Sequence, residues 1–83
     1  MPARHVVPSD DFAKATRTLD NSLRMRLDKQ IEKIIATPDV GKPLRYDMKG
    51  ERTIYVRPYR LIYKVEGETL FLLHFSHRKE AYK

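Results

Sequence analysis

Apolar side chains in the first half of the chain recur with the period of an α-helix. Residues 4–7 favour a short strand that Pro8 closes, and Ser9 is a typical helix N-cap with two acidic residues in the turn behind it. The next apolar or small side chains form one stripe at helical spacing, which comprises Phe12, Ala15, Thr16 and Leu19. The pattern therefore predicts a strand followed by a short helix that ends near Asp20.

A second helical pattern occupies residues 21–37. Asn21 or Ser22 can cap its start, and Pro38 disfavours helical backbone at Thr37, so we expect the helix to end there. Its buried face is predicted to comprise Leu23, Leu27, Ile31, Ile34 and Ile35. Because only one or two residues connect the two helices, they should pack as an antiparallel hairpin.

The apolar period changes from 3.6 to 2 in the second half of the chain, which is typical of strands. Strands are predicted over residues 44–48, 52–57, 60–65 and 69–75, with a hairpin turn at residues 66–68. The last strand is apolar on both faces, which indicates a central, covered position. The predicted elements follow one another along the chain in the order β-α-α-β-β-β-β. We therefore expect an α+β fold with a helix hairpin on one face of a mainly antiparallel sheet of four to five strands.

Composition narrows the class of protein. A chain of 83 residues fits one small domain, residues 1–83, and the absence of cysteine excludes disulfides, zinc-thiolate sites and thiol nucleophiles. A chain without cysteine also fits a reducing, cytoplasmic location. The longest uncharged apolar run, residues 69–76, is far shorter than the roughly 20 residues that cross a membrane, so we expect no membrane segment.

Positive charge is concentrated in the second half of the chain. The whole chain has a net charge of +6, and residues 42–83 hold ten basic against five acidic residues, a net of +5. Such an excess attracts nucleic-acid phosphates, although a basic face can also serve only to keep a small domain in solution. Tyr55 can stack a base or pair across strands. The candidates for RNA contact are Lys42, Arg45, Lys49, Arg52, Tyr55, Arg57 and Lys79.

RNA cleavage without a metal requires a base, an acid and cations that stabilise the phosphorane. The candidates are Arg60, His77, Arg78 and Tyr82. Arg60 should point away from the helix-covered core because its neighbour Leu61 points into it, and the residues after the last strand should approach the same face. Two plainer interpretations stay open, in which His77 is an ordinary surface residue and Tyr82 covers a sheet edge.

The other histidine in this region is interpreted as structural. His74 lies in the strand predicted to be central and is followed by Phe75. His74 and His77 are three residues apart, so on a strand their side chains point to opposite faces and do not readily share a metal ion. We therefore expect neither a metal site nor any other cofactor.

Two strings of residues resemble the RelE branch of the RelE/ParE toxin superfamily: YRLIYKV at residues 59–65 and HRKEAY at residues 77–82. GKPL at residues 41–44 and Lys49, Gly50 and Arg52 are also similar to this branch. The resemblance implies a toxin of a type II toxin–antitoxin module. It further implies a ribosome-dependent endoribonuclease that cleaves mRNA in the A site by attack of the 2′-OH on the adjacent phosphate, without a metal.

The resemblance also implies roles and partners. Arg60 corresponds to the phosphate-stabilising arginine, Arg78 to a second arginine of the site, and Tyr82 to the C-terminal tyrosine that acts as an acid or stacks. His77 corresponds to the histidine that begins this motif in many members. The implied partners are an acidic, RelB-like antitoxin, in a complex that is a heterotetramer or larger, and the ribosome with its mRNA.

The chain departs from the family pattern at one point. The best-studied branch has two lysines in the strand over residues 52–57, where this chain has Thr53 and Tyr55. If those lysines supply the general base, His77 or the arginines of the strand must replace them. This departure leaves two alternatives open: a ParE-like inhibitor of DNA gyrase with the same fold, or a non-catalytic basic module that binds RNA or an antitoxin.

Overall fold

The computed structural model describes residues 3–44 and 50–77. In chain order the elements are β1 (His5–Pro8), α1 (Asp10–Thr16), α2 (Asn21–Ala36), the 3-10 helix η1 (Pro38–Val40), β2 (Lys42–Pro43), β3 (Glu51–Val56), β4 (Tyr59–Glu66) and β5 (Thr69–His77). The short strand β2 precedes the strand predicted over residues 44–48, of which residues 45–48 lie outside the described part. Among the described helices, none has the length and apolar character needed to cross a membrane.

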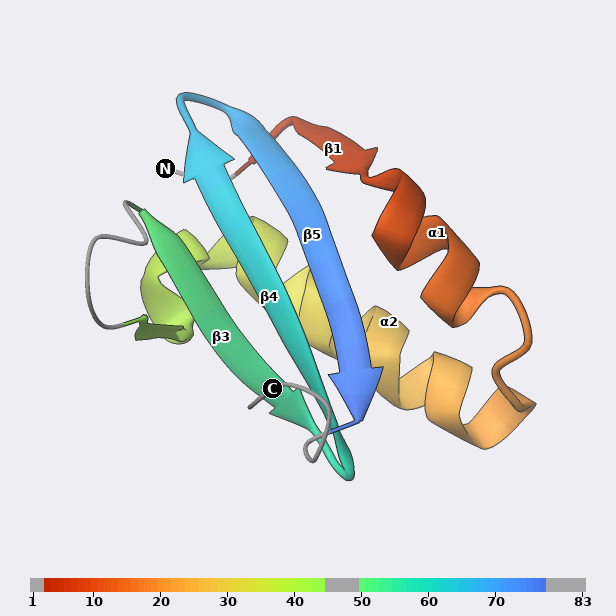
Figure 1. Cartoon of the computed structure of the whole chain (residues 1–83). Coiled ribbons are helices and arrows are strands. Elements are labelled where there is room, and N and C mark those ends of the chain that lie inside the picture. Colours follow the sequence, from red (N-terminus) through yellow and green to blue (C-terminus); the bar gives the residue numbers. More distant parts are fainter. Residues whose placement is uncertain (1–2, 45–49, 78–83) are drawn as a thin grey trace.

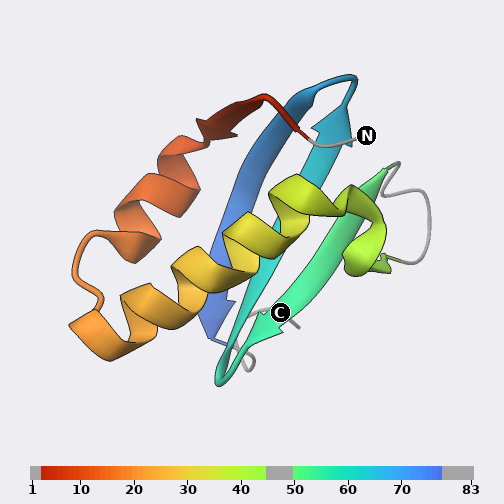
Figure 2. The same cartoon turned by 180° about the vertical axis from the view of Figure 1, so that it is seen from behind.

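The strands form one sheet in the order β1-β5-β4-β3-β2. β1 and β5 are parallel, whereas the other neighbouring strands are antiparallel. Helix α2 crosses one face of the sheet, behind the strands in Figure 1 and in front of them in Figure 2, and α1 continues from β1 beside β5. The opposite face carries no helix in the described residues. The predicted α+β fold is therefore confirmed.

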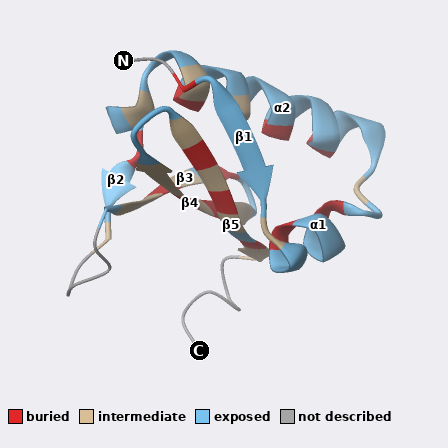
Figure 3. Ribbon diagram, turned by 90° about the horizontal axis from the view of Figure 1, so that it is seen from above, coloured by how far each residue is buried: buried red, intermediate tan, exposed pale blue. Residues whose placement is uncertain are grey.

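The hydrophobic core lies between the helices and the sheet (Figure 3). Its fully buried side chains come from α2, β4 and β5 and are Leu27, Ile34, Leu61, Tyr63 and Leu70. Alternation along β4 follows from this packing: Leu61 and Tyr63 point to the helices, so Arg60 and Ile62 point to the helix-free face. The predicted direction of Arg60 is confirmed.

Local capping defines the helix ends. Ser9 caps α1 as predicted, because its Oγ accepts a hydrogen bond from the Phe12 amide at 3.0 Å. α1 ends at Thr16, four residues earlier than expected. The prediction that Asn21 or Ser22 caps α2 is wrong. The N-cap is Asp20, whose Oδ1 accepts a hydrogen bond from the Leu23 amide at 2.8 Å.

A β-bulge in β5 changes which side chains face the helices. Ile62 pairs with His74 but Tyr63 pairs with Leu72, so Leu73 is an extra residue in β5. Before the bulge, Leu70 and Leu72 point to the helices. After the bulge, Phe75 does so, and His74 is left on the helix-free face. The expectation that this strand is covered on both faces is wrong, because the side chain of His74 is 54% exposed.

Ser9 holds the bulge in place. Its hydroxyl donates to the Leu73 carbonyl at 2.6 Å, and its amide donates to the Leu72 carbonyl at 2.9 Å. The same hydroxyl oxygen caps α1. One side chain therefore fixes both the start of α1 and the extra residue of β5.

Two side chains of α2 cover the part of the β3 edge that β2 does not reach. Gln30 Nε2 donates to the Tyr55 carbonyl at 3.4 Å, and Arg26 Nη2 donates to the Arg57 carbonyl at 2.8 Å. On its outer side β3 pairs with β2 only at Arg52 and Thr53, and Arg57 follows the end of β3, so neither carbonyl has a neighbouring strand there. The helix thus satisfies main-chain acceptors that an edge strand otherwise presents to solvent.

We predict that Ser9→Ala lowers the free energy of unfolding by about 2 kcal/mol, because it removes a helix cap and a hydrogen bond to the bulge together. The measurement is urea unfolding followed by circular dichroism. Ser22→Ala, at an exposed position in the first turn of α2, is the matched control and should stay within about 0.5 kcal/mol of the parent. Equal stability of the two variants would contradict the prediction.

Candidate functional site

The helix-free face of the sheet, here called the open face, presents rows of side chains from three strands, and two of these rows contain the candidate groups. Register places Tyr55, Arg60 and Ser76 in one row. It places Thr53, Ile62 and His74 in the adjacent row. Directly opposite side chains in antiparallel strands lie about 5 Å apart, so the members of each row are neighbours.

Arg60 lies near the start of β4 on the open face, where Tyr55 holds it. Its Nη2 donates to the Tyr55 hydroxyl at 3.0 Å, and its Cζ lies 5.1 Å from the centre of the Tyr55 ring. Arg60 is only 8% exposed, whereas Tyr55 is 38% exposed. The structure therefore combines an oriented guanidinium with an accessible aromatic ring, which are the groups that bind a phosphate and stack on a base.

His77 does not share this face with Arg60. It pairs with Tyr59 in the sheet register, whereas Arg60 pairs with Ser76, so alternation directs the two side chains to opposite faces. The His77 ring packs edge-on against Tyr59 at 5.6 Å, and Tyr59 stacks on Phe75 at 4.9 Å. The expected convergence of His77 and Arg60 on one face is therefore wrong, and a catalytic role for His77 stays a prediction.

His74 also lies on the open face. It is not among the candidate site residues predicted from the sequence. Its Nδ1 is 3.5 Å from Oδ2 of Asp11 in the first turn of α1. The two residues line a depression of about 570 Å³ together with Lys14, Ile62 and Ser76. The expectation that His74 lies in a covered strand is wrong, because the bulge exposes its side chain, whereas its interpretation as a structural residue stays a prediction.

Comparison with known proteins gives the family. A family model described as the ParE toxin of type II toxin-antitoxin system, parDE, matches residues 9–82. The chain belongs to this family, within the RelE/ParE toxin superfamily. It is thus a toxin of a type II toxin–antitoxin system. Comparison with curated protein sequences gave no match.

Solved toxin structures share the fold. The toxin is similar to a chain of the intact E. coli RelBE toxin-antitoxin complex, with 26% identity and a TM-score of 0.79 over 90% of this chain and 96% of that one. A YoeB/ParE toxin from Agrobacterium tumefaciens is 20% identical, with a TM-score of 0.78 over 90% and 99% of the two chains. The E. coli DinJ-YafQ toxin-antitoxin complex contains a chain that is 21% identical, with a TM-score of 0.76 over 96% and 98%.

The two positions at which the toxin departs from the RelE pattern lie side by side on the open face. Tyr55 contacts Arg60, as described above, and Thr53 is buried in the adjacent row. The Thr53 hydroxyl has no hydrogen-bond partner in the described part of the chain. The face that carries lysines in the best-studied branch therefore has a tyrosine–arginine pair here.

The predicted RNA contacts are divided between surfaces. Lys42 pairs with Thr53 and is exposed beside the open face. Arg57 lies at the other end of β3, in a groove of about 530 Å³ between this strand and α2, which Arg26, Lys29 and Lys33 also line. Five further site residues of the sequence analysis lie outside the described residues and stay predictions: Arg45, Lys49, Arg78, Lys79 and Tyr82.

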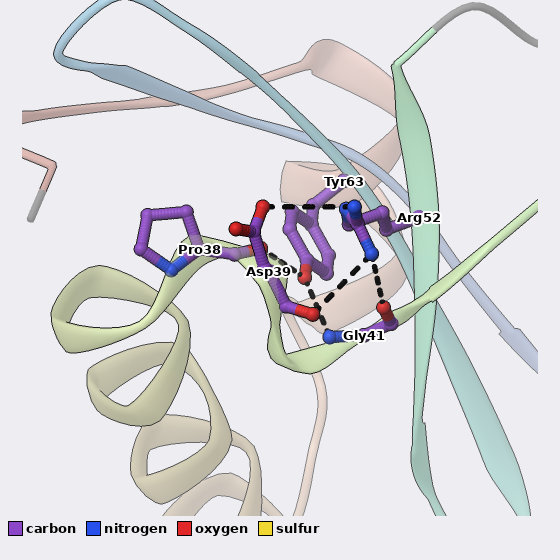
Figure 4. Close-up of polar contacts among 5 residues, drawn as sticks. All are labelled: Pro38, Asp39, Gly41, Arg52 and Tyr63. Atoms are coloured by element: carbon purple, nitrogen blue, oxygen red, sulfur yellow. Dashed lines mark hydrogen bonds and ion pairs between the residues drawn. The ribbon is translucent and has the colours of Figure 1, made fainter. Parts of the chain in front are cut away.

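Arg52 points away from the open face. It pairs with Tyr63, so its side chain extends toward the helix side, where Nη1 donates to the Gly41 carbonyl at 2.7 Å (Figure 4). Its Nη2 lies 3.6 Å from Oδ1 of Asp39. These contacts join β3 to the segment that follows α2, so the geometry of Arg52 is that of a structural residue.

The Tyr63 hydroxyl completes this network. It donates to the Pro38 carbonyl at 2.7 Å and accepts from the Gly41 amide at 2.9 Å. A Cβ atom on Gly41 would lie 2.7 Å from the Tyr63 oxygen, so only glycine fits there. Burial raises the pKa of Tyr63 above its ordinary value, and the Gly41 amide and the charge of Arg52 oppose this effect.

We predict that Tyr63→Phe lowers the free energy of unfolding by about 1–3 kcal/mol near neutral pH, because it leaves a carbonyl and an amide unpaired. Chemical unfolding measures the loss. Tyr59→Phe keeps the ring that stacks on Phe75 and serves as the matched control, with a smaller expected loss. Equal losses in the two variants would contradict the role given to the Tyr63 hydroxyl.

The same residue predicts a pH dependence. The folded pKa of Tyr63 is raised, so the unfolded chain releases this proton first, at about pH 10. The stability that the protonated hydroxyl contributes is complete below that pH and is lost as the pH rises through the folded pKa. The stability difference between the parent and Tyr63→Phe should therefore shrink in alkaline solution; a constant difference would contradict this.

Proposed function

We propose that this toxin is a metal-independent endoribonuclease, an mRNA interferase that cleaves mRNA in the ribosomal A site. The position of Arg60 carries the proposal. Its side chain lies on the helix-free face, is largely buried, and is oriented by Tyr55. An arginine placed in this way can donate to two oxygens of one phosphate group, and little rotational freedom is lost when it does so.

The proposed reaction follows from the substrate. The ribose 2′-OH loses its proton to a base, its oxygen bonds to the adjacent phosphorus, and the bond from phosphorus to the 5′-oxygen breaks. The products are a 2′,3′-cyclic phosphate and a 5′-hydroxyl, which takes up a proton. Arg60 stabilises the negative charge of the phosphorane, and Tyr55 stacks on a neighbouring base. Arg78 and Tyr82 are proposed as the second arginine and as the acid or stacking group.

The charge distribution supports an RNA ligand. Lys42 lies at the edge of the open face, and the groove of Arg57 has four cations and no carboxylate among its lining residues. Such surfaces bind phosphates by displacing counterions and would hold the toxin on the ribosome. A messenger substrate also requires the cytoplasm, which agrees with the absence of cysteine.

We propose an acidic, RelB-like antitoxin as the partner that neutralises the toxin. Solved relatives at 21–26% identity were crystallised as toxin–antitoxin complexes, including RelBE and DinJ-YafQ. The net charge of +6 favours an acidic polypeptide in that role. The proposed assembly is a heterotetramer or larger.

We predict that Arg60→Ala lowers the rate of mRNA cleavage on programmed ribosomes by at least about 100-fold, because the phosphorane loses its main cation. Primer extension maps the cleaved ends. Lys64→Ala is the matched control, since Lys64 is a cation on the same face of the same strand that pairs with Glu66, and it should keep the parental rate. Similar losses in both variants would indicate a general charge effect instead.

The tail motif gives a second test. Tyr82→Phe should abolish toxicity in induced cells, while folding and antitoxin binding are retained. Circular dichroism and co-purification with the antitoxin measure these two properties. Full toxicity of this variant would remove Tyr82 from the proposed site.

A ParE-like inhibitor of DNA gyrase is the second candidate function. Two observations favour it: the matching family model is that of the ParE toxin, and Thr53 and Tyr55 occupy the lysine positions of the RelE branch. In that case induced cells stop DNA replication while translation continues, and excess toxin leaves ribosome-bound mRNA intact. A non-catalytic basic module would change neither process.

A further inference from the structure

We propose that His74, oriented by Asp11, is the general base of this toxin. In this assignment Nε2 of His74 takes the proton of the attacking 2′-OH beside Arg60. The inference rests on the proposed RNA cleavage and adds a residue that the family pattern does not supply. It is carried by the β-bulge, by the His74–Asp11 pair and by the position of both relative to Arg60.

The bulge gives His74 its direction. In a regular strand the side chains of residues 70, 72 and 74 would all point to the helices. The extra residue Leu73 reverses this alternation, so His74 points to the open face with Ser76, and Phe75 and His77 point to the other. Ser9 fixes this geometry through its bond to the Leu73 carbonyl.

Asp11 then orients the imidazole. Its Oδ2 faces Nδ1 of His74 at 3.5 Å, an arrangement that favours the proton on Nδ1 and leaves Nε2 as the proton acceptor. The carboxylate also stabilises the imidazolium that forms when Nε2 takes a proton. Both side chains are solvent-accessible and line the same depression, so a ligand can reach them.

The separation of His74 and Arg60 allows both side chains to contact one phosphodiester group. His74 is opposite Ile62, and Arg60 is opposite Ser76, so His74 and Arg60 are diagonal neighbours on one face. Such positions lie about 7–8 Å apart in an antiparallel pair, and long side chains converge from them on one group. A phosphate bound to Arg60 can therefore place its attached ribose beside His74.

The other proton acceptors on the open face, among the described residues, are Glu51 and Glu66, and both neighbour Lys64 rather than Arg60. Thr53 and Tyr55 replace the family lysines, and His77 lies on the opposite face. Imidazole is the side chain that both accepts and donates a proton near neutral pH. The other charged groups around His74 are Lys14 on α1 and the diagonal neighbours Arg60 and Lys64 on β4.

The step balances in atoms and electrons. The 2′ O–H bond breaks and its proton moves to Nε2 of His74, while the 2′-oxygen forms a bond to phosphorus. The bond between phosphorus and the 5′-oxygen breaks, and this oxygen takes a proton from water. His74 then returns its proton to solvent, so the residue is regenerated.

The first experiment measures single-turnover mRNA cleavage on programmed ribosomes between about pH 5.5 and 8.5. His74→Gln should lower the rate by about 100-fold or more and remove the fall in rate toward acid pH. Asp11→Asn should lower the rate less, by roughly tenfold, while binding of the toxin to the ribosome is retained. His5→Gln, at an exposed position of β1, is the matched control and should keep the parental rate and profile.

The second experiment does not depend on cleavage. An uncleavable 2′-O-methyl RNA trinucleotide is titrated into the wild-type protein, and the imidazole NMR signals of the three histidines are followed. The His74 signals should move in a saturable way, while those of His5 should not. His74→Gln and His77→Gln assign the signals.

The outcomes separate the two proposals. Intact mRNA with the wild-type toxin would reject the proposed cleavage, and the titration would still decide whether His74 contacts RNA. Movement of the His77 signals with those of His74 unchanged would overturn this inference, as would no movement of any signal. A parental rate and pH profile in His74→Gln would also overturn it, and would leave RNA cleavage by Arg60 standing.

Discussion

The hydroxyl of Ser9 holds together the two features on which the candidate site depends. It accepts from the Phe12 amide at the start of α1 and donates to the carbonyl of Leu73, the extra residue of β5. A bulge reverses the alternation of side chains along a strand, so this contact decides which residues of β5 face the core and which face solvent. Asp11 and His74 meet because the residue that begins the helix also anchors the bulge.

The sheet thereby separates two kinds of chemistry. On its helix side, Phe75 and Tyr59 stack within the core, and Arg52 and Tyr63 bind main-chain groups next to Gly41. On its open side, Arg60 and Tyr55 contact each other with no helix above them in the described residues. Charged side chains of the same two strands thus bind main-chain groups on the helix side and an aromatic side chain on the open side.

Short-range patterns made much of the fold predictable. Ser9 can be recognised as a helix cap from the sequence because the amide that it binds, that of Phe12, is only three residues away. Gly67 has a positive φ in the hairpin turn predicted at residues 66–68. The direction of Arg60 follows from its neighbour Leu61, which is completely buried. Each of these inferences needs only residues that are close together in the sequence.

The errors came from contacts between distant segments. The bulge at Leu73 depends on a hydrogen bond that spans 64 residues, so nothing local in the strand over residues 69–75 indicates that His74 leaves the core. The charge of Arg52 is visible in the sequence, whereas its acceptors at Asp39 and Gly41 are not, and its contact with RNA stays a prediction. For the same reason, His77 was placed on the face that His74 occupies.

The covered edge of β3 has a consequence for how this sheet can grow. Gln30 and Arg26 already bind the Tyr55 and Arg57 carbonyls, so an incoming strand would first have to displace two side chains of α2. The outermost strands are β1 and β2, and neither has a paired strand on its outer side in the described residues, so α2 resists added strands only along the part of β3 that it covers. This partial cover removes one stretch of unpaired strand edge, which disfavours pairing between copies of the chain at that place.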